Sequence, residues 1–108
     1  MGSNGGLTNI NQTQFDSLKT QENVVVLDVR TPGEVQQGYI EGADLFIDIN
    51  GSNFEQEIAA LDTNKTYLVY CRSGARSSRA GNYMVEQGFN SVYNLSGGIM
   101  NYSGTIRR

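Results

Sequence analysis

The residues best suited to chemistry surround Cys71, the only cysteine among 108 residues. A lone cysteine is most often a small buried hydrophobe, but the residues after Cys71 do not suit an apolar slot. Arg72 and Arg76 place two permanent positive charges in one short loop, and Gly74 permits a positive φ, so that successive main-chain N–H groups can converge on one point. Such surroundings favour the thiolate over the thiol. The stretch therefore predicts an activated sulfur nucleophile inside an anion-binding loop.

The flanking segments predict where this thiol lies. The apolar run at residues 66–70 predicts a buried strand, and after the loop Ala80, Met84 and Val85 form an apolar stripe with helical spacing. Cys71 is thus expected where a strand ends and a helix begins. Unpaired N–H groups and the positive end of the helix dipole favour an anion at such a position.

The length of the loop separates two kinds of cysteine chemistry. Cysteine phosphatases have five residues between cysteine and arginine, a loop that holds a phosphate, whereas only residues 72–75 separate Cys71 from Arg76. The smaller loop suits one extra sulfur atom on the cysteine better than a phosphate. A phosphatase-like enzyme is the second candidate. A non-enzymatic binding module is the third, because a fold does not fix a function.

Composition limits how Cys71 can be activated and what the chain can bind. The chain has no histidine, which excludes Cys-His catalysis and His-ligated zinc, and one cysteine excludes an internal disulfide or a CxxC pair. No metal and no cofactor are therefore expected. A net charge of −3 argues against a nucleic-acid partner. Arg72, Arg76 and Arg79 nevertheless form a local basic spot that suits a small anionic substrate.

The length of 108 residues predicts one domain. No apolar run approaches a membrane span and no signal-peptide pattern is visible, so a cytoplasmic monomer without membrane contact is expected. Residues 1–6 are expected to be a flexible tail or a cloning remnant, which could stand in place of a removed leader. The domain is expected over residues 7–104, with residues 105–108 frayed.

Strands alternate with helical segments along the chain, which predicts an α/β fold with a mostly parallel sheet and helices on both faces. The expected strands are residues 7–10, 24–27, 45–49, 66–70 and 91–95. The expected helices are residues 12–20, 32–37 and 52–61 and a helix from the Cys71 loop to a cap at Gly88.

Local signals support these boundaries. Capping boxes are expected at Asn11–Gln14, at Thr31–Glu34 with Pro32 at the first helical position, and at Ser52–Glu55. Arg30 is expected to pair with Glu34 across the first helical turn. Asp28, at the end of a buried strand, is expected either to cap local N–H groups or to orient a loop arginine or the loop amides.

The sequence Cys-Arg-Ser-Gly-Ala-Arg-Ser at residues 71–77 is similar to the active-site loop of rhodanese-type sulfurtransferases. The resemblance to the single-domain rhodanese family covers residues 24–102. Three positions differ from the family pattern. The family often has an aromatic residue where this chain has Val35, a histidine where it has Tyr39 and a tryptophan where it has Tyr102. The matching segments are Asp28-Val29-Arg30, Pro32-x-Glu34, Gly38-x-Ile40-x-Gly42-Ala43, the Cys71 loop, Gly88-Phe89 and Leu95-x-Gly97-Gly98.

This resemblance implies a five-stranded parallel sheet and a cysteine that forms a persulfide. Cys71 would take the outer sulfur of an anionic donor such as thiosulfate, held by Arg72 and Arg76, and pass it to cyanide, a thiol or a dedicated partner protein. The remaining implied site residues are Ser73, Gly74, Ala75 and Ser77 in the persulfide loop, with Asp28 and Arg30 in support.

Overall fold

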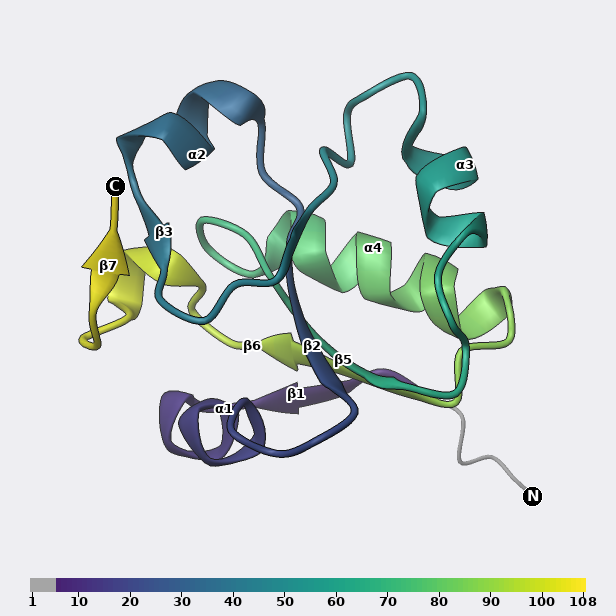
Figure 1. Ribbon diagram of the computed structural model, residues 1–108, viewed down its shortest axis with the longest axis horizontal. Helices are drawn as coiled ribbons and strands as arrows, with labels where there is room; N and C mark the ends of the chain where they lie inside the picture. The colour runs from purple at the N-terminus through teal and green to yellow at the C-terminus, as the bar shows by residue number, and fades with distance from the viewer. Residues whose placement is uncertain (1–5) are drawn as a thin grey trace.

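The structure is a computed structural model that describes residues 6–108. Its centre is a five-stranded sheet in the order β1-β6-β5-β2-β4, in which every neighbouring pair is parallel (Figure 1). This confirms the predicted parallel sheet. The strands are β1 (Thr8–Ile10), β2 (Val24–Asp28), β4 (Leu45–Phe46), β5 (Thr66–Tyr70) and β6 (Ser91–Leu95).

Helices cover both faces of the sheet, as predicted. The helices are α1 (Gln12–Leu18), α2 (Pro32–Gln37), α3 (Phe54–Ala59) and α4 (Ala75–Glu86), with a 3-10 turn η1 (Ile99–Asn101). Alternate strand residues point to opposite faces, so Leu27 packs with Met84 of α4, while Val26 packs with Phe15 of α1. Because both faces are covered, the central strands are continuous apolar runs.

The predicted helix starts are confirmed at α1 and α2. Asn11 and Gln14 form a capping box at α1, and Thr31 and Glu34 form one at α2, with Pro32 at its start. The third predicted box is wrong. Helix α3 begins at Phe54, and its N-cap makes no side-chain hydrogen bond, because the chain first completes a turn in which the Phe54 N–H donates to the Gly51 carbonyl at 3.3 Å.

Several predicted elements are shorter in the structure, among them a helix and a strand. Helix α1 ends at Leu18, and the expected strand at residues 45–49 pairs with β2 only at Leu45 and Phe46. Beyond β4 the chain still follows the end of β2, since the Ile47 N–H donates to the Asp28 carbonyl at 2.9 Å. Isolated bonds of this kind hold the segment in place without extending the ladder.

The prediction of a frayed C-terminus is wrong. Residues 106–107 form strand β7 (Ile106–Arg107), which pairs antiparallel with β3 (Tyr39–Ile40) (Figure 1). A further bond joins the Glu41 N–H to the Thr105 carbonyl at 3.0 Å. The folded unit therefore includes the last residues. Of the predicted tail at residues 1–6, all but Gly6 lies outside the described residues.

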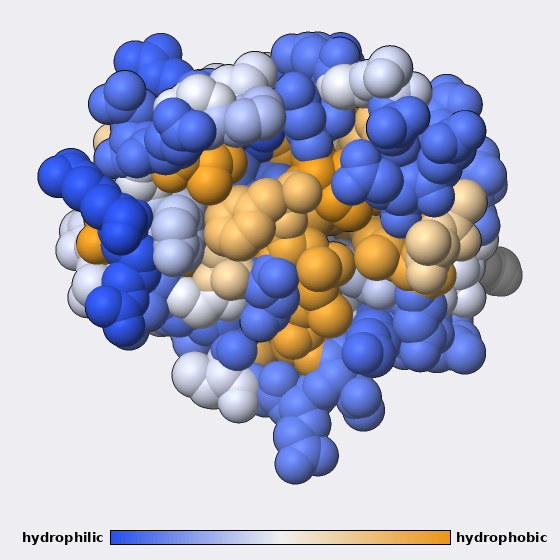
Figure 2. Space-filling view, turned by 45° about the horizontal axis from the view of Figure 1, so that its top comes forward, coloured by the Kyte–Doolittle hydropathy of each residue, from blue (hydrophilic) through white to orange (hydrophobic). Residues whose placement is uncertain are grey.

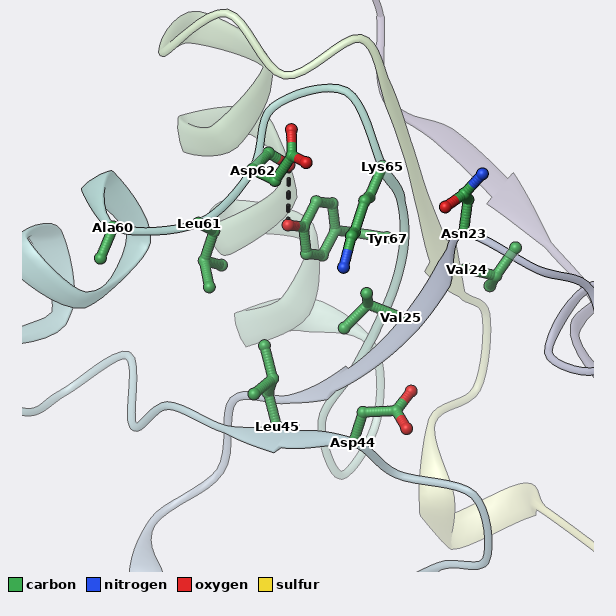
Figure 3. Close-up of a pocket in the computed structure, with 10 residues that line it drawn as sticks. All are labelled: Asn23, Val24, Val25, Asp44, Leu45, Ala60, Leu61, Asp62, Lys65 and Tyr67. Carbon is green, nitrogen blue, oxygen red and sulfur yellow. Dashed lines mark hydrogen bonds between the residues drawn. The ribbon is translucent and has the colours of Figure 1, made fainter.

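Apolar side chains form a band across one face of the molecule (Figure 2). A pocket of about 470 Å³ lies where β2 and β5 begin (Figure 3). Two of its polar side chains already bond within the chain. The Tyr67 hydroxyl donates to the Asp62 carbonyl at 2.8 Å, and Asp44 accepts from the Val26 N–H at 2.9 Å. This pocket lies at the opposite end of the strands from Cys71. Within residues 6–108, no helix has the length and apolarity to cross a membrane.

Candidate active site

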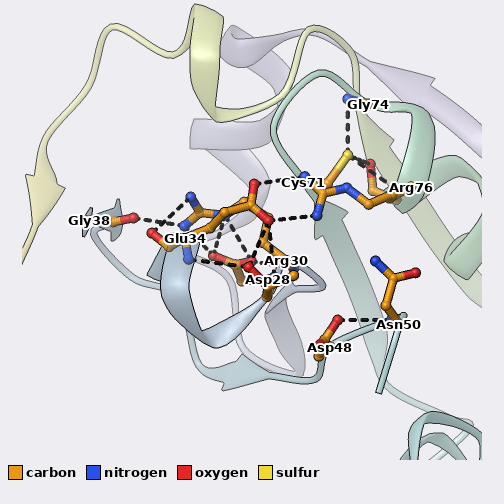
Figure 4. Close-up of polar contacts among 11 residues, drawn as sticks. Asp28, Arg30, Glu34, Gly38, Asp48, Asn50, Cys71, Gly74 and Arg76 are labelled. Carbon is orange, nitrogen blue, oxygen red and sulfur yellow. Dashed lines mark hydrogen bonds and ion pairs between the residues drawn. The ribbon is translucent and has the colours of Figure 1, made fainter. Parts of the chain in front are cut away.

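Cys71 directly follows β5, and its sulfur lies beneath the loop that leads into α4 (Figure 4). The Gly74 N–H donates to Cys71 Sγ at 3.1 Å and the Ser77 N–H at 3.3 Å. Gly74 is the N-cap of α4 with φ of 106°, a left-handed conformation that glycine adopts without strain. The convergence of main-chain donors that the sequence predicts is therefore present.

Cys71 is as buried as a core residue, with 1% of its surface exposed. It packs with apolar residues such as Val29 and Ala80, which agrees with the common role of a lone cysteine. A purely apolar slot, however, supplies no hydrogen-bond donors to the sulfur. The observed N–H groups make the site polar at the sulfur atom itself.

The pKa of the Cys71 thiol lies below its ordinary value. Burial raises this pKa, because the charged thiolate loses solvation. The Ser77 hydroxyl, in the orientation that points its proton at the sulfur, and the N–H groups of Ser77, Gly74 and Ser73 lower it by more. The thiolate, which is the nucleophilic form, is therefore favoured relative to a free cysteine.

Asn94 on β6 is a site residue that the sequence analysis missed. It is 4% exposed, and its side-chain amide donates to the Gly74 carbonyl at 3.3 Å and to Asn9 Oδ1 at 2.9 Å. Its oxygen accepts from the Ser77 hydroxyl at 2.5 Å. The signal that could have found it is a polar residue two positions after Val92, in the buried register of an apolar strand.

The segment after β6 supports the main chain of the cysteine loop. The Ile99 N–H donates to the Cys71 carbonyl at 2.9 Å, and the Met100 N–H donates to the Arg72 carbonyl at 3.0 Å. Gly98, with φ of 62°, lies so close that a Cβ atom would be 2.3 Å from the Arg72 carbonyl oxygen. The Gly-Gly pair that resembles the rhodanese family thus lies against the cysteine loop.

Arg76 has a partner that the sequence did not predict. Its guanidinium donates to both carboxylate oxygens of Glu34 on α2, at 2.7 and 2.8 Å (Figure 4). The predicted pair between Arg30 and Glu34 is wrong, because Arg30 reaches only the main-chain carbonyl of Glu34, at 3.5 Å. The arginine predicted to hold an anionic donor is therefore already bound to a carboxylate.

Asp28 and Arg30 form a separate buried pair at the end of β2. The Arg30 guanidinium donates to Asp28 Oδ2 at 2.7 Å and to the Gly38 carbonyl at 2.7 Å, and the Arg30 N–H donates to Asp28 Oδ1 at 2.8 Å. The expected capping of local N–H groups by Asp28 is confirmed. Its alternative role is not, because no hydrogen bond within the described chain joins Asp28 to residues 71–77. The pair instead joins the end of β2 to the C-cap of α2 at Gly38.

Arg72 is the loop arginine available to a ligand. It is exposed, as is the neighbouring Ser73, and within residues 6–108 its side chain takes part in no hydrogen bond or ion pair. Of the two arginines Arg72 and Arg76, only Arg76 is therefore already paired within these residues. Across the same residues, no group of three or more His, Cys, Asp or Glu side chains could hold a metal ion.

Replacing Glu34 by glutamine should destabilise the protein at neutral pH. The hydrogen bonds from Arg76 lower the pKa of Glu34 to about 2 from an ordinary 4.5, against a smaller opposing effect of burial. Since the folded-state pKa is depressed, this stabilisation is complete above about pH 4.5 and is lost as the pH falls towards 2. Both side chains are about a quarter exposed, so we expect a loss of about 1 kcal/mol.

Chemical denaturation at about pH 7, 5 and 3 measures this loss. The difference between wild type and Glu34→Gln should stay constant down to about pH 5 and shrink by about pH 3. Glutamine can keep the capping hydrogen bonds to Thr31, so the change isolates the ion pair. Glu55→Gln, at an exposed carboxylate in the first turn of α3, is the matched control. A loss that does not depend on pH would contradict the prediction.

Comparison with known proteins adds independent information. The model of the "Rhodanese-like domain" family matches residues 11–105. A sulfurtransferase from Allochromatium vinosum is 34% identical over 95 residues, which cover 84% of this chain and 86% of that protein. The thiosulfate sulfurtransferase GlpE of Pseudoalteromonas translucida is 33% identical over 90 residues, 83% of each chain.

Longer proteins also contain a related segment. A tRNA uridine(34) hydroxylase from Cytophaga hutchinsonii is 38% identical over 91 residues, which cover 82% of this chain but 29% of that protein. Among solved structures, a rhodanese-related protein from Thermoplasma volcanium is similar over 93% of this chain and 97% of its own, with a TM-score of 0.77 and 29% identity. The similarity therefore extends over the whole sheet and the cysteine loop.

Proposed function

We propose that this chain, which belongs to the rhodanese-like domain family, is a sulfurtransferase that carries a sulfur atom as a persulfide on Cys71. The observation that supports this most directly is the pair of N–H groups, from Gly74 and Ser77, that donate to Cys71 Sγ at the start of α4. They stabilise a negatively charged sulfur without a histidine, and the chain has none. Two relatives of matching length are named as sulfurtransferases.

In the first step the Cys71 thiolate attacks the outer sulfur of an anionic donor such as thiosulfate. A bond forms between the two sulfur atoms, and the bond from the outer sulfur to the sulfonate sulfur breaks. Sulfite leaves with that electron pair. Arg72 lies free at the loop surface to hold the sulfonate oxygens and to stabilise the charge of the departing sulfite.

The outer sulfur of the persulfide then needs hydrogen-bond donors. The N–H groups in the first turn of α4, which begins at Ala75, have no carbonyl one turn earlier to bond, and the loop serine Ser73 adds its own N–H. The positive end of the helix dipole favours the same negative charge. Residues 72–77 thus form a site for one extra sulfur atom.

In the second step an acceptor attacks the outer sulfur. Cyanide or a thiolate forms the new bond to sulfur, the bond between the two sulfur atoms breaks, and the Cys71 thiolate recovers the electron pair. Two half-reactions that share one covalent intermediate give ping-pong kinetics. A partner protein that offers a thiol could replace the small acceptor.

Intact-mass analysis tests the proposal. Wild-type protein incubated with thiosulfate should gain the mass of one sulfur atom, and cyanide should remove it with the release of thiocyanate. The same protein should not hydrolyse an aryl phosphate. Phosphate release without a sulfur adduct would establish the phosphatase-like alternative, and neither product from any sulfur donor would favour a binding module.

Replacing Arg72 by alanine should raise KM for thiosulfate by about tenfold, the size of one charge-assisted hydrogen bond. Steady-state kinetics with varied thiosulfate measures this change. Arg79→Ala is the matched control, because Arg79 is also exposed but lies in the second turn of α4, outside the cysteine loop. An equal rise of KM in both variants would mean that thiosulfate binding depends on the overall charge of the protein and not on a contact with Arg72.

A further inference from the structure

The hydroxyl group of Ser77 lies between two atoms that compete for its proton. Its Oγ is 2.5 Å from Asn94 Oδ1 and 3.4 Å from Cys71 Sγ. A serine hydroxyl carries a single proton, so it can donate to Asn94 or to the sulfur but not to both at once. The shorter and better-formed contact is the one to Asn94.

The orientation of Asn94 is fixed by its other contacts. Its amide nitrogen faces the Gly74 carbonyl at 3.3 Å and Asn9 Oδ1 at 2.9 Å. A carbonyl oxygen can only accept, so the nitrogen must point towards Gly74 and the oxygen of Asn94 must point towards Ser77. Two oxygen atoms at 2.5 Å need a proton between them, and only the Ser77 hydroxyl can supply it.

This arrangement presents a lone pair of Ser77 Oγ to the sulfur of Cys71. A lone pair suits a thiol that donates its S–H, but it gives no hydrogen bond to a thiolate. A hydroxyl that turned to the thiolate would leave the Asn94 oxygen without a donor, and Asn94 is 4% exposed. An unpaired buried acceptor costs free energy, so Asn94 opposes that rotation.

We propose that Asn94 is a positioning residue that sets the balance between thiol and thiolate at Cys71, because it holds the hydroxyl proton of Ser77. The main-chain N–H groups of Gly74 and Ser77 then stabilise the thiolate without a hydrogen bond from the Ser77 hydroxyl. The hydroxyl can donate to the sulfur only when it leaves Asn94. The inference deepens the proposed function, which requires the thiolate. Its test measures the protonation of the sulfur directly, so failure of sulfur transfer would not decide it.

The charged groups around the sulfur are the same in all the variants below. They are Arg72 and Arg76 of the loop and of α4, Glu34 of α2, which is bound to Arg76, and the buried Asp28–Arg30 pair at the end of β2. Asn94 and Ser77 themselves do not titrate. A shift in the titration of Cys71 between variants therefore reports the hydrogen bonding of the hydroxyl.

Ultraviolet absorbance of the thiolate, followed against pH, measures this titration for one sulfur, because the chain has one cysteine. In the wild-type background, Ser77→Ala should leave the midpoint unchanged or move it to lower pH, since it removes only an acceptor for the S–H. Asn94→Leu should move the midpoint to lower pH by about one unit, because the freed hydroxyl can donate to the thiolate. In the double variant, Ser77→Ala should reverse that shift.

A rise of the midpoint in Ser77→Ala alone would overturn the proposal, since it would show that the hydroxyl already donates to the sulfur. An unchanged midpoint in Asn94→Leu would leave Asn94 a purely structural role and would also overturn it. Asn94→Val, which suits a strand, replaces the leucine variant if that protein does not unfold cooperatively. A rise of the midpoint in Ser77→Ala overturns the proposal without any Asn94 variant, whereas the lower midpoint of the Asn94 variant and its reversal in the double variant support it.

Discussion

Replacing Cys71 by serine should abolish sulfur transfer from thiosulfate to cyanide. We expect a loss of about a thousandfold or more, on the scale seen when a covalent nucleophile is removed. A serine hydroxyl cannot form a persulfide, and the hydrogen bonds to Cys71 Sγ stabilise an anion that serine does not form at neutral pH. Thiocyanate release under saturating donor measures the rate, and intact mass should show no sulfur adduct.

The fold of Cys71→Ser should be nearly unchanged, so the loss can be assigned to chemistry. The side chain is similar in size, and the N–H groups of Gly74 and Ser77 that now donate to sulfur can donate to the serine oxygen. Ser73→Ala is the matched control, because the Ser73 side chain is exposed and alanine keeps the main-chain N–H that Ser73 contributes to the site. It should retain its activity and its Tm. Transfer by Cys71→Ser at an appreciable fraction of the wild-type rate would rule out the persulfide mechanism.

The position of Cys71 could be predicted because every signal for it is local. An apolar strand before the cysteine, a glycine at Gly74 and a helical stripe after it all lie within about twenty residues along the chain. The converging N–H groups follow from the geometry of a strand that leads into a helix. In the structure Cys71 lies between β5 and α4, as this prediction requires, and two N–H groups donate to its sulfur.

The partner of Arg76 could not be predicted, because the choice between carboxylates depends on tertiary structure. Glu34 is four residues from Arg30, a spacing that favours a pair on one helix, but it is 42 residues from Arg76. Arg30 instead turns inward to Asp28, which is 0% exposed and would otherwise be a buried charge without a partner. The cost of that unpaired charge decides the arrangement.

Strand β7 was missed for a related reason. It pairs only two residues, Ile106 and Arg107, with Tyr39 and Ile40. Such a short pair has no alternating pattern of its own, and it exists because the chain returns to the partner strand from far along the sequence. Asn94 was missed because its buried amide gains its partners, Ser77 and Gly74, only after β6 aligns beside β5.

Replacing Gly98 by alanine should disrupt the cysteine loop. A Cβ atom at this position would lie 2.3 Å from the carbonyl oxygen of Arg72 and 2.6 Å from that of Cys71. Both are main-chain atoms, and the Ile99 and Met100 N–H groups bond to the same two carbonyls, so no flexible side chain can yield. The loop itself must move, and we expect a loss of about 3 kcal/mol in stability.

The effect of Gly98→Ala on activity should be larger than its effect on the rest of the fold. A displacement of about 1 Å in reacting groups can cost about a hundredfold in rate, and here the displaced atoms carry the nucleophile. Gly97→Ala is the matched control, because Gly97 also has a positive φ, of 81°, but its Cβ would meet the Asn101 side chain at 3.0 Å. That variant has the same kind of backbone strain but no collision with main-chain atoms, because the close contact is with a side chain that can move. Denaturation and sulfur-transfer assays on both variants separate the two causes, and equal activity in the two would show that Gly98 does not hold the loop in place.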